Sequence, residues 1–254
     1  MGIGHAHALY LHGHSRIHRL APPTKVVAAF IFVVAVAVTP REAIWGFGVD
    51  AGALLGIAAV GRIPPRFVAA RLPVILPFIT FAFLIPFIAS GEQVEILGVS
   101  VSQEGLWATW NIVAKATLGA MTSIILVATT EVPDILKGMS TLRVPAVFIS
   151  IAAFMMRYLE LVVDELNRMR MAMAARGYDP RWLWQVKPIA TSSGALFVRS
   201  YERGERVHAA MLSRGFTGTM PTIDDAAPAP NDWAVALALP ALGIAVAVAA
   251  MVGT

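Results

Sequence analysis

Five long apolar stretches constrain the fold of this 254-residue chain more than any other feature of its sequence. An α-helix needs about 20 mostly apolar residues to cross a hydrocarbon core roughly 30 Å thick. Only 14% of the residues are charged, against about 25% in soluble domains. We therefore expect an all-α integral membrane protein. The stretches cover residues 26–39 with their flanks, 43–60, 73–89, 106–130 and 233–252, and a sixth run at 144–156 is too short to span alone.

The twenty Lys and Arg residues predict which loops face the cytoplasm, because positively charged loops are retained there. Three precede the first stretch, three separate the second from the third, and twelve lie between Lys137 and Arg214. The loop at 90–105 instead carries three glutamates and no basic residue. We expect the N-terminus, the loop near residue 62 and the region 131–231 to be cytoplasmic, and the C-terminus to lie on the other side.

The first stretch also has the form of a signal peptide, with Ala35-Val36-Ala37 imitating a cleavage site. Residues 1–25 form a long leader for such a peptide, and the distribution of basic residues is consistent with the segment being retained. We expect it to remain as the first span.

Charge divides the chain into three parts: N-terminal transmembrane helices at 1–130, a cytoplasmic section at 131–231, and a C-terminal transmembrane helix at 232–254. In the middle part a short helix is predicted from Pro133 to near Thr141. Such a charged section inside an apolar protein indicates contact with another protein, because acidic residues are interleaved with the basic ones. We expect no nucleic-acid partner.

Residues 147–176 contain no proline or glycine, which predicts one helix of about 45 Å. Apolar residues recur in it at spacings of three and four, with charged residues between them. This stripe therefore needs a partner helix. It consists of Leu159, Val162, Leu166, Met169 and Met173.

The partner is predicted by an internal repeat, since Met-Ala-Ala-Arg-Gly-Tyr at 173–178 aligns with Met-Leu-Ser-Arg-Gly-Phe at 211–216. A second amphipathic helix is therefore expected at about 191–214, joined to the first by a turn at 178–188. Small residues on its stripe would permit a close crossing near Ser200 and Gly204. The predicted crossing residues are Leu166, Met169 and Met173 on the first helix, and Ser200, Gly204, Val207 and Met211 on the second.

Each predicted helix ends in Arg-Gly. Glycine is favoured just past a helix end, and arginine in the last turn complements the helix dipole, so a cap explains either occurrence alone. Two such ends, each with its arginine three residues after a methionine and its glycine followed by an aromatic residue, also fit a pair of basic tips that dock into two equivalent acidic grooves. A partner present in two copies would supply them.

With these motifs the chain resembles the T component of energy-coupling factor transporters. The family carries two Ala-Arg-Gly motifs on cytoplasmic coupling helices, which stand here as Ala175-Arg176-Gly177 and Ser213-Arg214-Gly215. The resemblance extends to 141–145, to Arg157-Tyr158 and to the segment 20–25. In that last segment relatives usually carry aspartate where Ala21 stands.

This resemblance implies five to six transmembrane helices and a cytoplasmic section of coupling helices that cross each other. It also implies that these six motif residues contact two ATPase subunits, and that the chain couples them to a separate substrate-binding subunit in the bacterial cytoplasmic (inner) membrane. The chain has no G-x-x-x-x-G-K-[ST], so ATP and Mg are expected on the partner ATPase and no cofactor on this chain. It also lacks H-E-x-x-H and G-x-S-x-G, and we expect no catalytic residue.

The resemblance is closest to the CbiQ-type branch, which implies cobalt as substrate, with nickel or a vitamin as alternatives. Imidazole suits cobalt and nickel, and five histidines lie near the N-terminus. That cluster lies on the expected cytoplasmic side, so a solvated tail or a product-side trap is the competing interpretation. No metal ligand is assigned here. The five are His5, His7, His12, His14 and His18.

Two charged residues interrupt apolar stretches. Lys115 is either a functional group or a side chain that reaches toward the outer face. Asp50 fits buried pairing or contact with a substrate subunit. A stand-alone secondary transporter is the alternative from another class, but it would carry broken helices or ionisable residues at mid-membrane in both halves.

Overall fold

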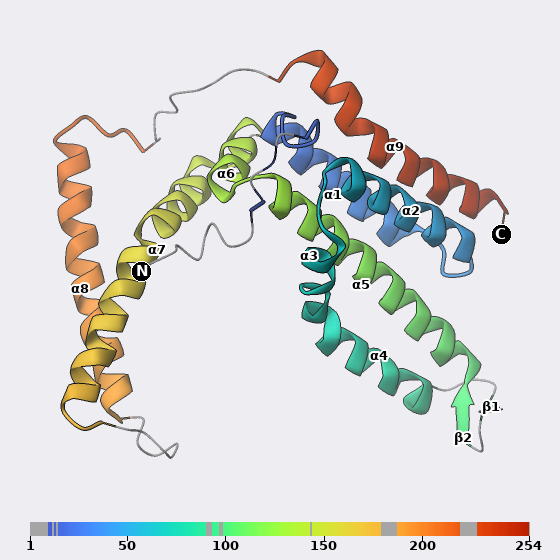
Figure 1. Ribbon diagram of the computed structural model, residues 1–254, viewed down its shortest axis with the longest axis horizontal. Coiled ribbons are helices and arrows are strands. Elements are labelled where there is room, and N and C mark those ends of the chain that lie inside the picture. Colours follow the sequence, from blue (N-terminus) through green and yellow to red (C-terminus); the bar gives the residue numbers. More distant parts are fainter. Residues whose placement is uncertain are drawn as a thin grey trace. The chain divides into compact units, whose positions relative to one another are not determined.

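The computed structural model describes residues 10, 11, 13, 15–89, 93–96, 99–142, 144–178, 187–218 and 228–253, and these are predominantly helical (Figure 1). Contacts divide the chain into two compact units. One, the helix bundle, contains α1–α6, a short β-hairpin and α9; the other, the α7–α8 hairpin, contains the remaining two helices. The elements are α1 (Pro22–Val38), α2 (Ile44–Val60), α3 (Pro65–Ala69), η1 (Leu72–Ile75), α4 (Leu76–Ile88), β1 (Gln93–Ile96), β2 (Val99–Ser102), α5 (Gln103–Thr129), α6 (Val132–Thr141), α7 (Ala146–Ala175), α8 (Lys187–Leu212) and α9 (Pro230–Gly253).

Four segments of the described chain are long and apolar enough to cross a membrane: Pro65–Ile88, Gln103–Thr129, Ala146–Ala175 and Pro230–Gly253. The apolar helices α1 and α2 are shorter, at 17 residues each. The first of the four combines α3, η1 and α4, and its irregularity follows from its prolines. The third is the 30-residue helix α7, which continues the apolar run at 144–156 without a break and matches the single helix expected over 147–176.

The core of the bundle lies between α1, α2 and α5, where Phe32, Leu54 and Leu118 are almost fully buried. Two glycines allow close backbone contact around it. A Cβ at Gly105 in α5 would lie 2.6 Å from Cα of Pro86 in α4, and one at Gly138 in α6 would lie 3.1 Å from Cα of Pro23 in α1. The bundle is thus a packed helical body of the kind that the apolar stretches predict.

The bundle has two chemically different ends. Helices α1 and α9 begin, and α2 and α5 end, at the same end (Figure 1). This end, called the basic end below, carries Arg16, Arg19 and Lys25 near the start of α1 and Arg62 after α2. The β-hairpin, which we expected to be a loop, lies at the opposite end and includes Glu95. The loops predicted to share a side therefore do share an end of the bundle.

Helix α6 belongs to the bundle, not to the coupling section in which we placed it by charge. It packs against α1 through the contact of Gly138 with Pro23. The boundary between the two compact units consequently falls between residues 142 and 143, whereas the charge pattern put it at 131. The reason is that Gly138, a buried glycine, allows α6 to pack closely on α1, and the distribution of charge in the sequence does not reveal this contact.

Candidate functional site

The α7–α8 hairpin consists of two antiparallel helices with the predicted motifs at their C-terminal ends. The turn predicted at 178–188 lies largely outside the described residues. In Figure 1 the helices lie together where α7 ends and α8 begins, and separate toward the other end of the hairpin. No residue of α7 is fully buried, so this unit has little core of its own.

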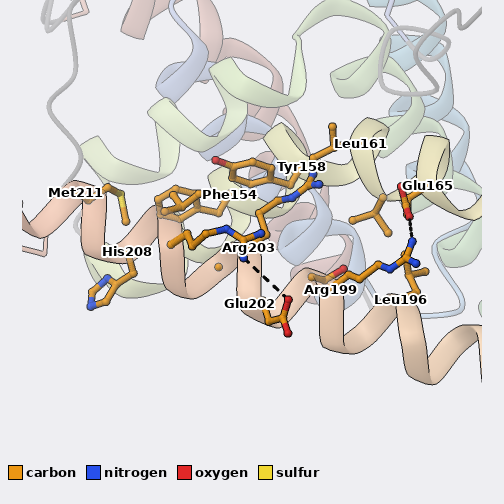
Figure 2. A pocket seen from close by; sticks show the side chains of 15 residues that line it. Phe154, Tyr158, Leu161, Glu165, Leu196, Arg199, Glu202, Arg203, His208 and Met211 are labelled. Carbon is orange, nitrogen blue, oxygen red and sulfur yellow. Dashed lines mark hydrogen bonds and ion pairs between the residues drawn. The ribbon is translucent and has the colours of Figure 1, made fainter.

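Polar contacts between described residues join the helices. The hydroxyl of Ser192 donates to the Met173 sulfur at 3.4 Å, and Arg199 forms an ion pair with Glu165 (Figure 2). Glu165 also accepts a hydrogen bond from Arg168 at 2.7 Å. The apolar part of α7 ends before Asp164, so these ion pairs lie in its charged half. The hydrogen bonds from Arg168 and Arg199 lower the pKa of Glu165 below its usual range, and the carboxylate stays charged at neutral pH.

Beyond these contacts a cavity of about 540 Å³ opens between the helices. The aromatic rings of Phe154 and Tyr158, stacked with centroids 6.3 Å apart, form part of its α7 wall (Figure 2). A second hollow of about 680 Å³ shares these rings and extends to Arg214 and Phe216. The separated end of the hairpin therefore forms an amphipathic groove that leads to one of the two tips.

The structure corrects the predicted crossing. Gly204 lines the cavity, and a Cβ placed on it would have no neighbour within 4 Å, so no close helix contact occurs there. Ser200, Val207 and Met211, which the repeat placed at the crossing, line the cavity too. On the first helix, Leu166, Met169 and Met173 are half-buried, although Leu159 of the same stripe is 43% exposed. The internal repeat predicts equivalent faces for both helices and aligns Leu159 with Phe197 of α8, but Phe197 is 72% exposed.

Both tips adopt the same cap. The amide of Tyr178 donates to the Met173 carbonyl at 3.1 Å and that of Gly177 to Ala174 at 3.0 Å. The repeat reproduces this pair of bonds with Phe216 and Met211, and with Gly215 and Leu212, at 3.0 Å each. This is the Schellman motif, in which glycine takes a left-handed conformation and the residue after it contacts the helix three residues before its end. The cap therefore explains the Met, Gly and aromatic positions of the repeat.

The cap does not account for the arginines. Arg176 and Arg214 both occupy the last half-helical position and are exposed. Neither contacts a carboxylate within the described part of the chain. The neighbouring Ala175 and Ser213 are also exposed, so each tip presents an uncompensated guanidinium on a rigid, mostly small-residue surface. Because α8 has 26 residues and runs antiparallel to α7, the two tips lie at opposite ends of a helix roughly 39 Å long.

The residues that sequence reasoning missed are those that hold the hairpin and line its groove. The Glu165–Arg199 pair joins positions 34 apart, and the repeat carries no signal for it. Tyr158 was named only through the family resemblance, and Phe154 was not named at all. Helix periodicity marks a face, but it does not say where two such faces separate.

Charged residues singled out in the bundle have local structural surroundings. The Lys115 ammonium donates to the Ala37 carbonyl at 2.7 Å. Asp50 is fully buried, and neither of its carboxylate oxygens has a hydrogen-bond partner among the described residues. The sequence left buried pairing and contact with a substrate subunit open for Asp50; the side chain is buried within the chain, and the described residues supply no partner for it.

The histidine cluster is represented by His18 alone, because His5, His7, His12 and His14 lie outside the described residues. The ring of His18 bonds through Nε2 to the Leu11 carbonyl at 3.0 Å and through Nδ1 to the Ser15 hydroxyl at 2.7 Å. Both nitrogens are thereby occupied. In the portion of the chain with described coordinates, no group of three acidic or histidine side chains is arranged to hold a metal.

A family model described as CbiQ, cobalt transport protein, matches residues 13–223. The energy-coupling factor transporter transmembrane protein EcfT of Bacillus subtilis is 26% identical over 231 residues, covering 82% of this chain and 83% of that protein. The cobalt transport protein CbiQ of Rhodobacter capsulatus is 29% identical over 170 residues, covering 66% and 68%. The chain therefore belongs to the CbiQ cobalt transport protein family, and it is a multi-pass transmembrane component of an energy-coupling factor or cobalt transporter.

Proposed function

We propose that this chain is the coupling subunit of an ATP-driven importer, transmitting movements of two ATPase subunits to a separate substrate-binding membrane subunit. The observation that carries the proposal is the pair of identical caps, each presenting an exposed arginine without an acidic partner in the described structure. The chain itself has no phosphate-binding loop, so ATP with its Mg would be bound and hydrolysed by the partners.

The tips are suited to acidic grooves. A guanidinium is always charged and forms two parallel hydrogen bonds with a carboxylate, which holds a helix end in a fixed orientation while the groove moves. The Schellman cap supports Arg176 and Arg214 equally, because its backbone bonds have almost the same lengths at both tips. Equal tips favour equal grooves, and therefore two copies of one ATPase.

The antiparallel arrangement favours one ATPase subunit per tip. The two tips are separated by the length of α8, too far for both to enter one small groove. A relative movement of the two ATPases would then pull on opposite ends of one hairpin. The hairpin is held by few contacts, so such a pull would change how far the helices separate.

The groove between α7 and α8 is the surface we assign to the substrate-binding subunit. Its α7 wall is mainly apolar apart from Glu165, and Phe148 and Met155 of the same helix are 66% and 68% exposed. Large exposed apolar patches mark interaction sites. Since the groove leads to Arg214, a subunit seated in it would respond to movement at that tip.

Cobalt is the substrate we propose, on the strength of the family description and of the CbiQ relative. The importer would carry the ion through its substrate-binding subunit. Uptake of cobalt, nickel and vitamins by the complete transporter in liposomes would test this assignment. Preferential uptake of nickel or of a vitamin would overturn cobalt as the proposed substrate, but it would not contradict the proposed coupling role.

The coupling role is tested by capture of the ATPase subunits in detergent. Wild-type chain should retain them, and the Arg176→Glu, Arg214→Glu double variant should not, because charge reversal repels an acidic groove. Each single variant should retain an intermediate amount if the tips act as equals. The matched control is Arg66→Glu, which reverses an exposed arginine of the helix bundle, outside the α7–α8 hairpin. Equal capture by the double variant and the control would overturn the proposal and leave the arginines as caps only.

A further inference from the structure

A second hollow, in the helix bundle, is not used by the coupling function. It is a groove of about 410 Å³ at the basic end between α1, α2, α5 and α9. The two threonines in its wall are satisfied within α5, Thr122 by the Leu118 carbonyl at 2.8 Å and Thr129 by that of Ile125 at 2.9 Å. The remaining wall is almost entirely apolar, and includes Ala28, Leu54, Ile57, Ile125, Leu239 and Leu242.

The groove has a basic rim. Lys25 lines it directly, and its ammonium donates to the carbonyls of Thr129 at 3.0 Å and His18 at 3.3 Å. Arg16 and Arg19 are exposed and adjoin the lining residues Ile17 and Leu20. Neither arginine forms an ion pair with an acidic residue of the described chain.

Arg62 adds to this rim at a conformational cost. Arg62 lies two residues after Val60, the last lining residue of α2. Its φ is +53°, and it is the single non-glycine residue of the described chain with positive φ. The amides of Arg62 and Ile63 close a Schellman cap on α2, donating to the carbonyls of Ala59 at 3.0 Å and Ala58 at 2.9 Å. At the tips of α7 and α8 the cap position that corresponds to Arg62 is occupied by glycine, Gly177 and Gly215. An L-residue is strained there, and a strained residue is a reason to look for a function of its side chain.

Acidic groups near the rim are few. Asp134 of α6 acts on Lys25 electrostatically, but it is itself paired with Lys137 at 3.3 Å. Glu131, next to the end of α5, and Asp232, in the first turn of α9, are half-buried. Three arginines and one lysine thus outnumber three carboxylates around the apolar groove, and one of the three is already paired with Lys137.

We propose that this groove binds an anionic phospholipid, with one acyl chain between the four helices and the phosphate held by Arg62, Arg16 and Arg19. An apolar wall alone does not select a lipid, because acyl chains gain little by leaving other acyl chains. Selection therefore rests on charge, and an anionic headgroup complements this rim. The site is independent of the ATPase tips and of the substrate, so it stands whether or not the coupling role holds.

The test uses the full-length chain in mixed micelles that contain equal amounts of dioleoyl-phosphatidylglycerol and dioleoyl-phosphatidylcholine. Native mass spectrometry of the wild type should show preferential retention of one phosphatidylglycerol. Arg62→Gln should reduce the preference by about fivefold, the factor expected for one basic residue near an anionic surface. Arg41→Gln is the matched control, since Arg41 is exposed at the opposite end and pairs with Glu42 at 2.8 Å.

Two further variants separate the lipid site from a purely structural role of Arg62. Arg62→Gly should raise the melting temperature, because it relieves the left-handed strain, and should still lose phosphatidylglycerol. Ala29→Phe should lose the bound lipid with the rim unchanged, because it fills the groove from α1. Equal retention of the two lipids by the wild type would overturn the proposal. So would an equal loss in the Arg41→Gln control, or unchanged retention in both Arg62→Gly and Ala29→Phe.

Discussion

Gly177 and Gly215 have nearly the same left-handed conformation, with φ of 76° and 81°, and each follows an exposed arginine at the end of its helix. The identity of the two caps extends to their hydrogen bonds. The repeated hexapeptide therefore encodes a repeated backbone geometry, and both arginines are presented in the same way.

Replacing Gly177 or Gly215 by alanine is expected to loosen the tip. A Cβ in the left-handed region costs roughly 1–2 kcal/mol, and the cap would open to avoid it. Hydrogen exchange of the amides at 177, 178, 215 and 216 should then accelerate.

The matched control for the tips is Gly194→Ala. Gly194 lies within α8, and a Cβ on it meets nothing within 4 Å. Alanine there should slow exchange in α8, because glycine in a helix interior costs up to about 1 kcal/mol. Faster exchange in this control, or unchanged exchange at the two tips, would contradict the cap geometry.

The ion pair of Glu165 with Arg199 should make the hairpin sensitive to acid. The pKa of Glu165 is lowered in the folded chain by the hydrogen bonds from Arg168 and Arg199. The stabilisation is therefore fully present above the unfolded pKa of about 4.3 and is lost as the pH falls through the lower folded value. Spin labels introduced at Ala172 and Ala195 of this cysteine-free chain should show a broader distance distribution at low pH.

The Glu165→Gln variant is the test of that assignment. It should give the broad distribution at neutral pH and lose the acid-dependent change. A distribution that still broadens with acid in this variant would mean that another group opens the hairpin.

Gly105→Ala is expected to destabilise the bundle. The added Cβ would lie 2.6 Å from Cα of Pro86, and a backbone atom does not yield as a flexible side chain does. Overpacking of this kind costs typically 1–3 kcal/mol, and it should lower the melting temperature in detergent. Gly119→Ala is the comparison, since a Cβ there has no neighbour within 4 Å, and an equal loss in both variants would argue against close packing of α4 on α5.

Lys25→Met should detach the segment before α1 from the end of α5. The buried ammonium joins the carbonyls of His18 and Thr129, and Leu11 bonds to the Ala128 carbonyl beside them at 3.0 Å. Leaving a buried acceptor unpaired costs about 1–3 kcal/mol. The expected results are a lower melting temperature and faster proteolysis after Arg16 and Arg19. Lys25→Arg keeps the charge and should remain closer to the wild type, and proteolysis unchanged in Lys25→Met would show that other contacts hold the segment.

The sequence by itself determined the membrane class, the main helices and their ends. Apolar length, proline position and the Arg-Gly caps act within a few residues of chain, so α6, α7 and α9 lie within a few residues of their predicted limits. The two caps could be predicted from 173–178 and 211–216 for the same reason, because a Schellman motif is closed by bonds inside its own six residues.

Only the tertiary structure decided which faces meet. Gly204 borders a cavity instead of a crossing, Glu165 pairs with Arg199, and α6 packs on α1 through Gly138. These contacts join residues far apart in sequence, and a helical stripe carries the same pattern whether it meets a partner in its own chain, another subunit or lipid. The charge on Arg62 was visible in the sequence, but its left-handed backbone and its place beside an apolar groove depend on how four helices pack.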